Sequence, residues 1–419
     1  MSFHAVDFGT SNSLLSFISS EGKISSVPLD LNAKVVLRSL LYTPEKNIWY
    51  FGEEAINEYV TRDGEGRFFR SIKKFLPEPN YSGTSVFNRN MSISDLVAII
   101  LKEMRTRANR FTGVETNRIV LGRPALYSLD LDHDKLAQDR MEAAALLAGY
   151  KEVSFCPEPI AAGLDYSSAP NEEKIVLIAD FGGGTSDFTL MKTGRGDYNQ
   201  DNILGISGVF KAGDALDSDL MRDFIAPNFG SNFEYQFPGS SNILKFPRNL
   251  LKKICSPAHI THLREKDTWE FLQHINKFAL STEDKKKMEN LFNLVECQLG
   301  FPLFNEIEKT KIKLTQHENV DFRYKQFGID IHEVISTNAF NTSVTPTVCE
   351  IMETMMDVFK QSGLTSQDVD QVVLTGGTSQ FPLIQQGLEK TFGKSKMSEH
   401  DIYHSVVNGL ARFAAQSLD

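Results

Sequence analysis

The sequence reads Ala179-Asp180-Phe181-Gly182-Gly183-Gly184-Thr185-Ser186-Asp187 in its middle part, and this segment repeats one near the start of the chain. The earlier copy reads Val6-Asp7-Phe8-Gly9-Thr10-Ser11-Asn12. In each copy an apolar strand ends at an aspartate, a turn of small residues follows, and a second strand begins. One such turn is often an ordinary hairpin, but two matching copies predict two similar lobes, each presenting a turn to a shared cleft.

Both turns suit a phosphate chain. Glycine lets backbone amides approach an anion closely, and Thr10, Ser11 and Thr185 add hydroxyl donors. Asp7 and Asp180 would repel bound phosphates unless a cation stood between them. Mg²⁺ is therefore implied, contacted through the water molecules that it holds tightly.

Composition limits the partners. The 419 residues carry a formal net charge of −10, and the pI is near 5.5. This acidic net charge argues against sequence-independent binding of nucleic acid, which needs a basic surface. No run has the pattern of a signal peptide or the length of a membrane span, and the four cysteines are far apart. We therefore expect a monomeric cytoplasmic protein with reduced thiols and no membrane contact.

Strand-like and helix-like segments are mixed along the chain, which is typical of α/β architecture. The apolar run 174–179 predicts a strand buried on both faces. We expect Ser94 to cap a helix from Asp95 to about Arg110. The segment Phe229–Pro247 reads as irregular loop, and the aromatic residues of Phe224–Phe246 are expected in the core rather than on a partner surface.

In three further segments, glycines stand at positions where their presence needs a structural explanation. Gly163 and Gly409 fall inside helical patterns, where glycine costs about 1 kcal/mol relative to alanine. Two closely crossing helices would explain them, either as tight packing or as a sliding contact between lobes. After the strand that ends at Thr375, Gly376 and Gly377 form an entry into a helix, and helix N-termini attract anions. The same entry is also an ordinary connection.

In this order and spacing, these elements resemble the actin-type ATPases, and most closely the nucleotide-binding half of the heat-shock-70 (DnaK-type) family. Further matches lie at Trp49–Ala55, Lys73–Leu76 and Glu308–Thr315. The resemblance implies a two-lobed α/β fold with a duplicated ribonuclease-H-like core and a nucleotide cleft between the lobes. It places lobe I at 1–170, with an insert at about 37–116 and completion by 398–419, and lobe II at 171–397, with an insert at about 213–325.

The resemblance also implies roles for single residues. Asp7 and Asp180 would hold Mg²⁺ through water, and Lys73, otherwise read as a solvated surface lysine, would steer the γ-phosphate and the attacking water. Glu158 and Asp187 would help to orient water and metal, with Thr185 beside them. The phosphates would be cradled by Gly9, Thr10, Ser11, Asn12, Gly182, Gly183, Gly184 and Thr185. The nucleoside would be surrounded by Gly213, Glu308, Lys311, Thr315, Gly376, Gly377, Thr378 and Gln380.

The implied function is binding of Mg·ATP with slow hydrolysis to ADP and phosphate. The lobes would close on the nucleotide and relay its state to a protein partner or client, in a chaperone-like or regulatory role. Ile312 and Gln380 stand where the family stacks two arginines on adenine, so the base stays open, and a nucleotide-binding module without turnover is the alternative. More distant alternatives are a small-molecule kinase and an actin-like filament protein.

The peptide-binding part of the full chaperones has no counterpart in this sequence. The helix expected at 404–416 is followed by neither their apolar linker nor their β-domain. The chain therefore resembles the short bacterial heat-shock-70-like proteins that lack the substrate-binding domain.

Overall fold

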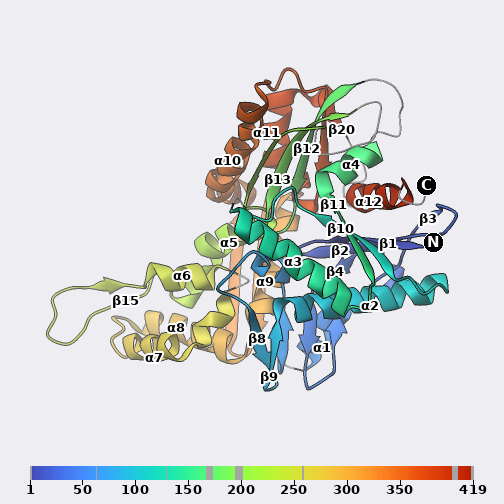
Figure 1. Ribbon diagram of the computed structural model, residues 1–419. Coiled ribbons are helices and arrows are strands. Elements are labelled where there is room, and N and C mark those ends of the chain that lie inside the picture. Colours follow the sequence, from blue (N-terminus) through green and yellow to red (C-terminus); the bar gives the residue numbers. More distant parts are fainter. Residues whose placement is uncertain are drawn as a thin grey trace.

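Two mixed β-sheets form the centre of the structure, and helices pack against each of them (Figure 1). This arrangement confirms the expected α/β architecture. The computed structural model describes residues 2–62, 64–128, 130–166, 173–193, 202–256, 259–398 and 404–416. The predicted boundary between residues 170 and 171 lies outside these ranges, as do 399–403 and 417–419 of the predicted C-terminal completion, so the lobe limits stay predictions.

The first sheet is built by the N-terminal part of the chain. Its strands run in the order β11-β10-β1-β2-β3, and β4 pairs with β2 beside this path. β10 is parallel to both β1 and β11, whereas β2 is antiparallel to β1 and to β3. The bounds are β1 Phe3–Phe8, β2 Asn12–Ile18, β3 Ile24–Ser26, β4 Leu37–Arg38, β10 Arg118–Arg123 and β11 Glu152–Pro157.

The second sheet repeats this topology. Its strands run in the order β14-β13-β12-β19-β20. β19 is parallel to β12 and β20, while β13 is antiparallel to β12 and β14, so each strand has a counterpart in the first sheet. The predicted duplication of the core is therefore confirmed. The bounds are β12 Lys174–Phe181, β13 Ser186–Thr193, β14 Ile203–Val209, β19 Gln371–Thr375 and β20 Met397–Ser398.

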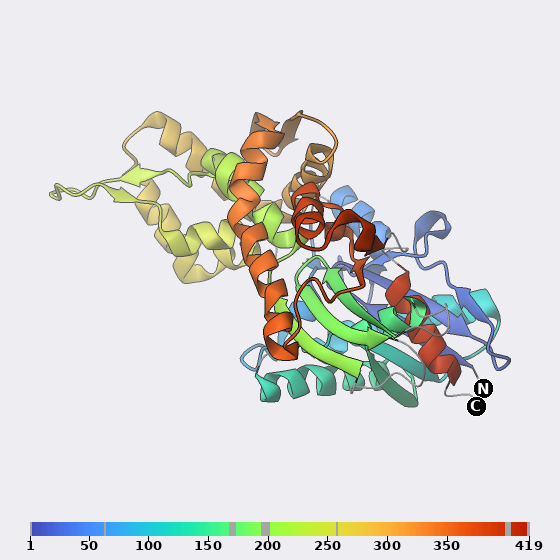
Figure 2. The same cartoon turned by 90° about the horizontal axis from the view of Figure 1, so that it is seen from above.

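Long helices cover the outer faces of the sheets. α2 (Ile93–Thr112) and α3 (Leu131–Leu147) pack on one another beside the first sheet, and α10 (Thr337–Ser362) lies along β13 and β14 of the second (Figure 2). α11 (Pro382–Phe392) follows β19 and contacts α10.

The predicted start of α2 is wrong by two residues. Ser92, and not Ser94, caps the helix: its hydroxyl accepts from the backbone of Asp95, whose carboxylate accepts from the backbone of Ser92. This reciprocal capping box needs a spacing of three residues, which only Ser92 has. The helix ends at Gly113, whose φ of 71° is the left-handed conformation that favours glycine.

Two helices cross between the sheets, α4 (Glu158–Tyr166) and α12 (Ser405–Gln416). A Cβ atom on Gly409 would lie 1.7 Å from the carbonyl oxygen of Ala161, so the backbones approach as closely as only glycine permits. A Cβ on Gly163 would lie 2.9 Å from the sulfur of Met191. The predicted close crossing is confirmed.

An insert in the first half of the chain forms one wall of the cleft. Its three-stranded sheet has the order β6-β5-β7, and a second hairpin, β8–β9, leads into α2. A 3₁₀ turn between β7 and β8 carries Lys73. The bounds are β5 Leu41–Thr43, β6 Tyr50–Phe51, α1 Gly52–Thr61, β7 Arg67–Phe69, the 3₁₀ turn Ile72–Phe75, β8 Gly83–Val86 and β9 Arg89–Ser92.

The insert in the second half is mostly helical. It begins at α5 (Gly213–Leu220), which continues as one π-helical turn, Met221–Ile225, and a 3₁₀ turn, Ala226–Phe229. The hairpin of β15 and β16 projects from this insert (Figures 1 and 2). The remaining bounds are β15 Glu234–Tyr235, β16 Leu244–Lys245, α6 Arg248–Ile254, α7 Lys266–Asn276, α8 Thr282–Glu296, α9 Gly300–Leu314, β17 Asn319–Gln326 and β18 Ile329–Ser336.

Four of the six aromatic residues between Phe224 and Phe246 lie in the core, as predicted, and Phe224 and Phe237 pack partly buried against it. Phe229 and Phe233 are fully buried, and Tyr235 and Phe246 nearly so. The prediction of an irregular loop over 229–247 is wrong in part, because β15 and β16 lie within it. Each of these strands has two residues, too few for an alternating pattern to be visible.

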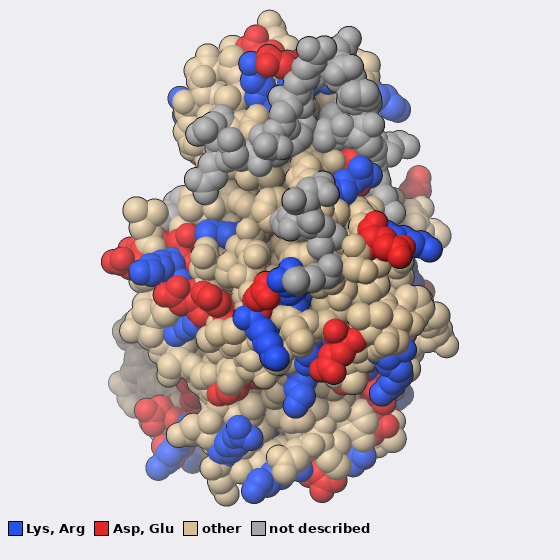
Figure 3. Space-filling model, turned by 45° about the vertical axis from the view of Figure 1, so that its right-hand side comes forward, with Lys and Arg blue, Asp and Glu red and all other residues tan. Residues whose placement is uncertain are grey.

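Charges are mixed on the surface. On the face drawn in Figure 3, basic and acidic side chains lie interspersed, which gives that side a mixed potential. Among the described helices, none is long and apolar enough to cross a bilayer. All four cysteines are free; Cys156 and Cys255 are buried and Cys349 is exposed.

Candidate functional site

The two glycine turns are closed by the same hydrogen bond. The backbone N–H of Gly9 donates to the carbonyl of Asn12 over 3.0 Å, and that of Gly182 donates to the carbonyl of Thr185 over 3.0 Å. In each hairpin the aspartate is the last residue but one of the strand before the turn. The two copies are therefore alike in backbone as well as in sequence.

The turns meet across the cleft. A Cβ atom on Gly183 would lie 2.0 Å from the hydroxyl oxygen of Ser11, and a Cβ on Gly184 would lie 3.2 Å from the methyl group of Thr10. A side chain at Gly183 would therefore displace that of Ser11, and one at Gly184 would first displace Lys74, whose Cε would lie 2.3 Å away. Glycine here lets loops from distant parts of the chain touch.

One cavity of about 670 Å³ lies between these turns and the two inserts. Of the residues predicted for the site, it is lined by Asp7, Gly9, Thr10, Ser11, Asn12, Lys73, Glu158, Asp180, Gly182, Gly183, Thr185, Asp187, Gly213, Glu308, Lys311, Thr315, Gly376, Gly377, Thr378 and Gln380. Gly184 lines instead a neighbouring cavity of about 430 Å³. The fold thus brings together nearly all the residues that the sequence singled out.

Three aspartates and one glutamate gather at the inner end of this cavity. Desolvation, and then the charge of Glu158, raises the pKa of Asp7 to about 8 and that of Asp180 to about 6. Desolvation, and then the charge of Asp180, raises the pKa of Asp187 to about 7. Each carboxylate makes its neighbours harder to ionise, so the cluster calls for added positive charge.

Lys73 supplies part of that charge. Its ammonium lies 3.0 Å from Oε1 of Glu158, and the two side chains are only 12% and 11% exposed. Burial lowers the pKa of Lys73, but the charges of Glu158, Tyr127 and Asp7 outweigh it, so the pKa is raised and the lysine stays charged. The alternative of a solvated surface lysine is wrong.

A second ion pair closes the cleft beside the turns, and the sequence did not point to it. Nζ of Lys74 lies 2.7 Å from Asp214 at the start of α5, and Arg70 lies 3.7 Å from the same carboxylate. Burial raises the pKa of Asp214, but the two cations outweigh it, so the pKa is lowered. The only sequence signals were that Lys74 follows Lys73 and that Asp214 follows Gly213.

The outer end of the cavity lies between α9 and the turn after β19. Glu308, Lys311, Ile312 and Thr315 line it from positions that share one face of α9. From the other side, the hydroxyl of Thr378 donates to the carbonyl of Gly182 over 2.8 Å, which fixes this turn against the second glycine turn.

Two ion pairs fix α9 at this end. Lys311 pairs with Asp217 of α5 over 2.9 Å. Glu308 pairs with Arg38 over 2.7 Å, a contact that joins α9 to the N-terminal half of the chain.

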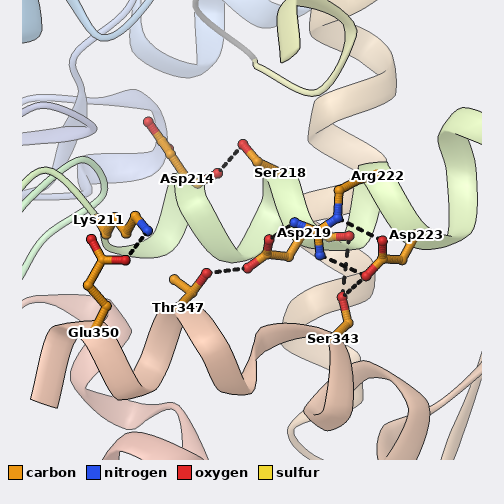
Figure 4. Close-up of polar contacts among 9 residues, drawn as sticks. All are labelled: Lys211, Asp214, Ser218, Asp219, Arg222, Asp223, Ser343, Thr347 and Glu350. Carbon is orange, nitrogen blue, oxygen red and sulfur yellow. Dashed lines mark hydrogen bonds and ion pairs between the residues drawn. The ribbon is translucent and has the colours of Figure 1, made fainter. Parts of the chain in front are cut away.

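α5 is held in place from behind. Figure 4 shows Asp219 and Asp223 on this helix and its π-helical turn, facing hydroxyls of α10. Thr347 donates to Asp219 and Ser343 to Asp223, each over 2.6 Å, and Arg222 pairs with both carboxylates. Because these bonds anchor α5 to α10, the residues at the start of α5 have a fixed place in the cavity wall.

The donor set fits Mg²⁺ held through water. Within the described part of the chain, no group of three or more His, Cys, Asp or Glu residues could hold a metal ion directly. The carboxylates of Asp7, Asp180 and Asp187 nevertheless line one cavity and hold raised pKa values. Mg²⁺ keeps several of its waters and is well suited to such an arrangement.

Comparison with known proteins agrees with this geometry. The profile of the family described as Hsp70 protein matches residues 73–245 and 274–415. The chain belongs to the Hsp70 family. Its fold is therefore the two-lobed actin-like ATPase fold.

Individual Hsp70 relatives are distant in sequence. The chaperone protein HscA homolog of Aliivibrio fischeri (strain MJ11) is 22% identical over 427 aligned residues, covering 97% of this chain and 56% of the relative. Chaperone protein DnaK of Thermotoga petrophila is 24% identical over 414 residues, covering 98% of this chain and 58% of the relative. The chain thus spans little more than half the length of the curated relatives that it matches.

Proposed function

We propose that this chain binds Mg·ATP in the cavity between its lobes and hydrolyses it slowly to ADP and phosphate. The observation that carries the proposal is the meeting of two aspartate-ended hairpins around Lys73. Mg²⁺, when bound, would neutralise the phosphate oxygens and the aspartates at once. Asp7 and Asp180 would face its water shell, and the backbone amides of both turns would face the phosphates.

The remaining residues divide the work of hydrolysis. Lys73, held by Glu158, would place a fixed positive charge at the terminal phosphate. Asp187 has a pKa of about 7, so near neutral pH it can accept a proton from an attacking water. Phosphoryl transfer depends mainly on such positioning and charge stabilisation. Slow hydrolysis is consistent with a protein in which the ATP-bound conformation serves as a signal.

Lobe closure would carry that signal to a protein partner. Lys74 and Arg70 form ion pairs with Asp214 across the cleft. Asp214 lies in the first turn of α5, and Thr347 of α10 is hydrogen-bonded to Asp219 of the same helix. A change in the spacing of the lobes would therefore move α5 and α10 with it. The crossing of α4 and α12 would be the place where the lobes slide on one another.

The test measures binding and turnover separately. Calorimetry with Mg·ATP should show a single site, and phosphate release should be slow and measurable. Lys73→Ala should abolish release while leaving the protein folded. Lys34→Ala, which breaks a surface pair with Glu53, is the matched control and should release phosphate like the wild type.

Two results would count against the proposal in different ways. A chain that binds no nucleotide would defeat it entirely. Tight binding without release in the wild type would identify the alternative, a binding module that signals through conformation alone.

A further inference from the structure

The outer end of the cavity has an unusual lining. Ile312 of α9 is 54% exposed there. Gln316, Gln380 and Gln385 also line the cavity and are exposed. Besides Thr315 and the paired charges of Glu308 and Lys311, this end therefore offers one exposed aliphatic side chain and three exposed carboxamides to whatever lies beyond the phosphates.

The positively charged side chains that line the cavity are engaged in ion pairs. A cation stacked over a ring would hold a nucleobase tightly. The basic residues that line the cavity in the described ranges all lie against carboxylates, in the pairs Lys73–Glu158, Lys74–Asp214, Arg70–Asp214 and Lys311–Asp217. Each of these four cations is therefore already engaged by a carboxylate.

The three carboxamides suit more than one base. Each carries a donor and an acceptor, and rotation about the terminal bond exchanges the two. Adenine presents a donor next to an acceptor on its pairing edge, and guanine presents the reverse order. Within the residues that the structure describes, Gln316, Gln380 and Gln385 make no side-chain hydrogen bond, so each can turn to match either edge.

We propose that the site takes purine nucleoside triphosphates with little preference between adenine and guanine. This inference rests on the proposed function and names its substrate class. The two glycine turns hold the phosphates and supply most of the affinity. The base adds apolar contact with Ile312 and hydrogen bonds that any purine can make, in competition with water at an exposed rim.

Calorimetry on the full chain with Mg²⁺ present tests this directly, with ATP, GTP and tripolyphosphate as the three probes. The expected dissociation constants for ATP and GTP differ by less than about tenfold. A site that hydrogen-bonds one base specifically discriminates far more strongly. A preference of more than about tenfold for either base would overturn the inference.

Variants at the rim sharpen the result. Ile312→Arg should tighten both nucleotides, because a guanidinium stacks on any base. Gln380→Leu should weaken ATP and GTP by similar, small factors, and a loss confined to one base would contradict the inference. The matched control is Gln273→Leu, an exposed glutamine of α7 outside the cavity.

The same experiment distinguishes failure of the proposed function from failure of the inference about the base. If neither nucleotides nor tripolyphosphate bind, the proposed function fails. If ATP binds and GTP does not, only the inference about the base fails.

Discussion

The two glycine-turn hairpins share one backbone plan and differ at one decisive position. In the first hairpin Asp7 lies opposite Leu14, and in the second Asp180 lies opposite Asp187. Leu14 and Asp187 occupy equivalent places, since each is the second residue after the one that closes its turn. Duplication thus explains two acids that face the cleft, and later divergence explains the third.

The turns themselves also diverged. Thr10 and Ser11 of the first turn correspond to Gly183 and Gly184 of the second. The first turn carries two hydroxyls, whereas the second has glycines at these positions, which leave room for the side chains of the first turn. Two copies of one motif have therefore become unequal halves of a single site. The first supplies the hydroxyls of Thr10 and Ser11, and the second supplies the hydroxyl of Thr185, space and an extra acid.

The largest effect is expected at the position that breaks the symmetry. Asp187→Asn should lower phosphate release about a hundredfold or more, because asparagine cannot take a proton from water. Binding of Mg·ATP should change little, since Asp7 and Asp180 remain. Phosphate release and calorimetry on the same preparation measure the two effects.

A control accompanies this variant. Asp321→Asn changes an exposed aspartate on β17, away from the cavity, and should behave like the wild type. If Asp187→Asn kept its full rate, the third acid would have no part in turnover, and the functional difference between the hairpins would disappear.

A smaller effect separates the two turn glycines that close the same hydrogen bond. A Cβ atom on Gly9 would lie 2.3 Å from the carbonyl oxygen of Asn12, whereas one on Gly182 would lie 3.4 Å from that of Thr185. Gly9→Ala should therefore lower the free energy of unfolding by about 1–3 kcal/mol. Gly182→Ala should cost less than about 0.5 kcal/mol. Urea unfolding measures both, and equal costs would show that the turns are equally tight.

The smallest effect concerns the charge of the first hairpin. Because the pKa of Asp7 is raised from 3.8 to about 8, the folded protein holds a proton across this pH range that the unfolded chain has released. Stability of the nucleotide-free protein should therefore fall as the pH rises through that window. Asp7→Asn should remove part of the loss and raise the thermal midpoint at pH 8 by about 2–4 °C.

Thermal scans across the same window check this prediction. The wild type and Asp7→Asn should converge below about pH 3, under both pKa values, where Asp7 is protonated in the folded and the unfolded wild type. Identical midpoints at pH 8 would mean that the first hairpin carries no electrostatic strain.

Local chemistry made much of the site predictable. Asp7, Asp180 and the glycine turns are contiguous in sequence, and strand-turn-strand patterns are short-range signals. The predicted cap lies two residues from the observed one because Ser92 and Ser94 compete there, and only the reciprocal bond with Asp95 decides between them.

Long-range contacts were predictable only through resemblance, or not at all. Lys73 reaches Glu158, and Lys74 reaches Asp214, across long stretches of chain whose path no spacing rule reveals. Lys73 was identified because its segment resembles a family motif. Asp214 has no such motif, since its role depends on where the first insert folds back.

The crossing of α4 and α12 has a consequence for synthesis on the ribosome. Phe3 and Ile18 of the first sheet share a buried cluster with Val406 and Leu410 of α12. These partners are translated almost a whole chain later, so the part of the first sheet that α12 covers stays exposed until α12 emerges. The nascent chain would thus expose part of its apolar surface for most of its translation, a condition that favours aggregation.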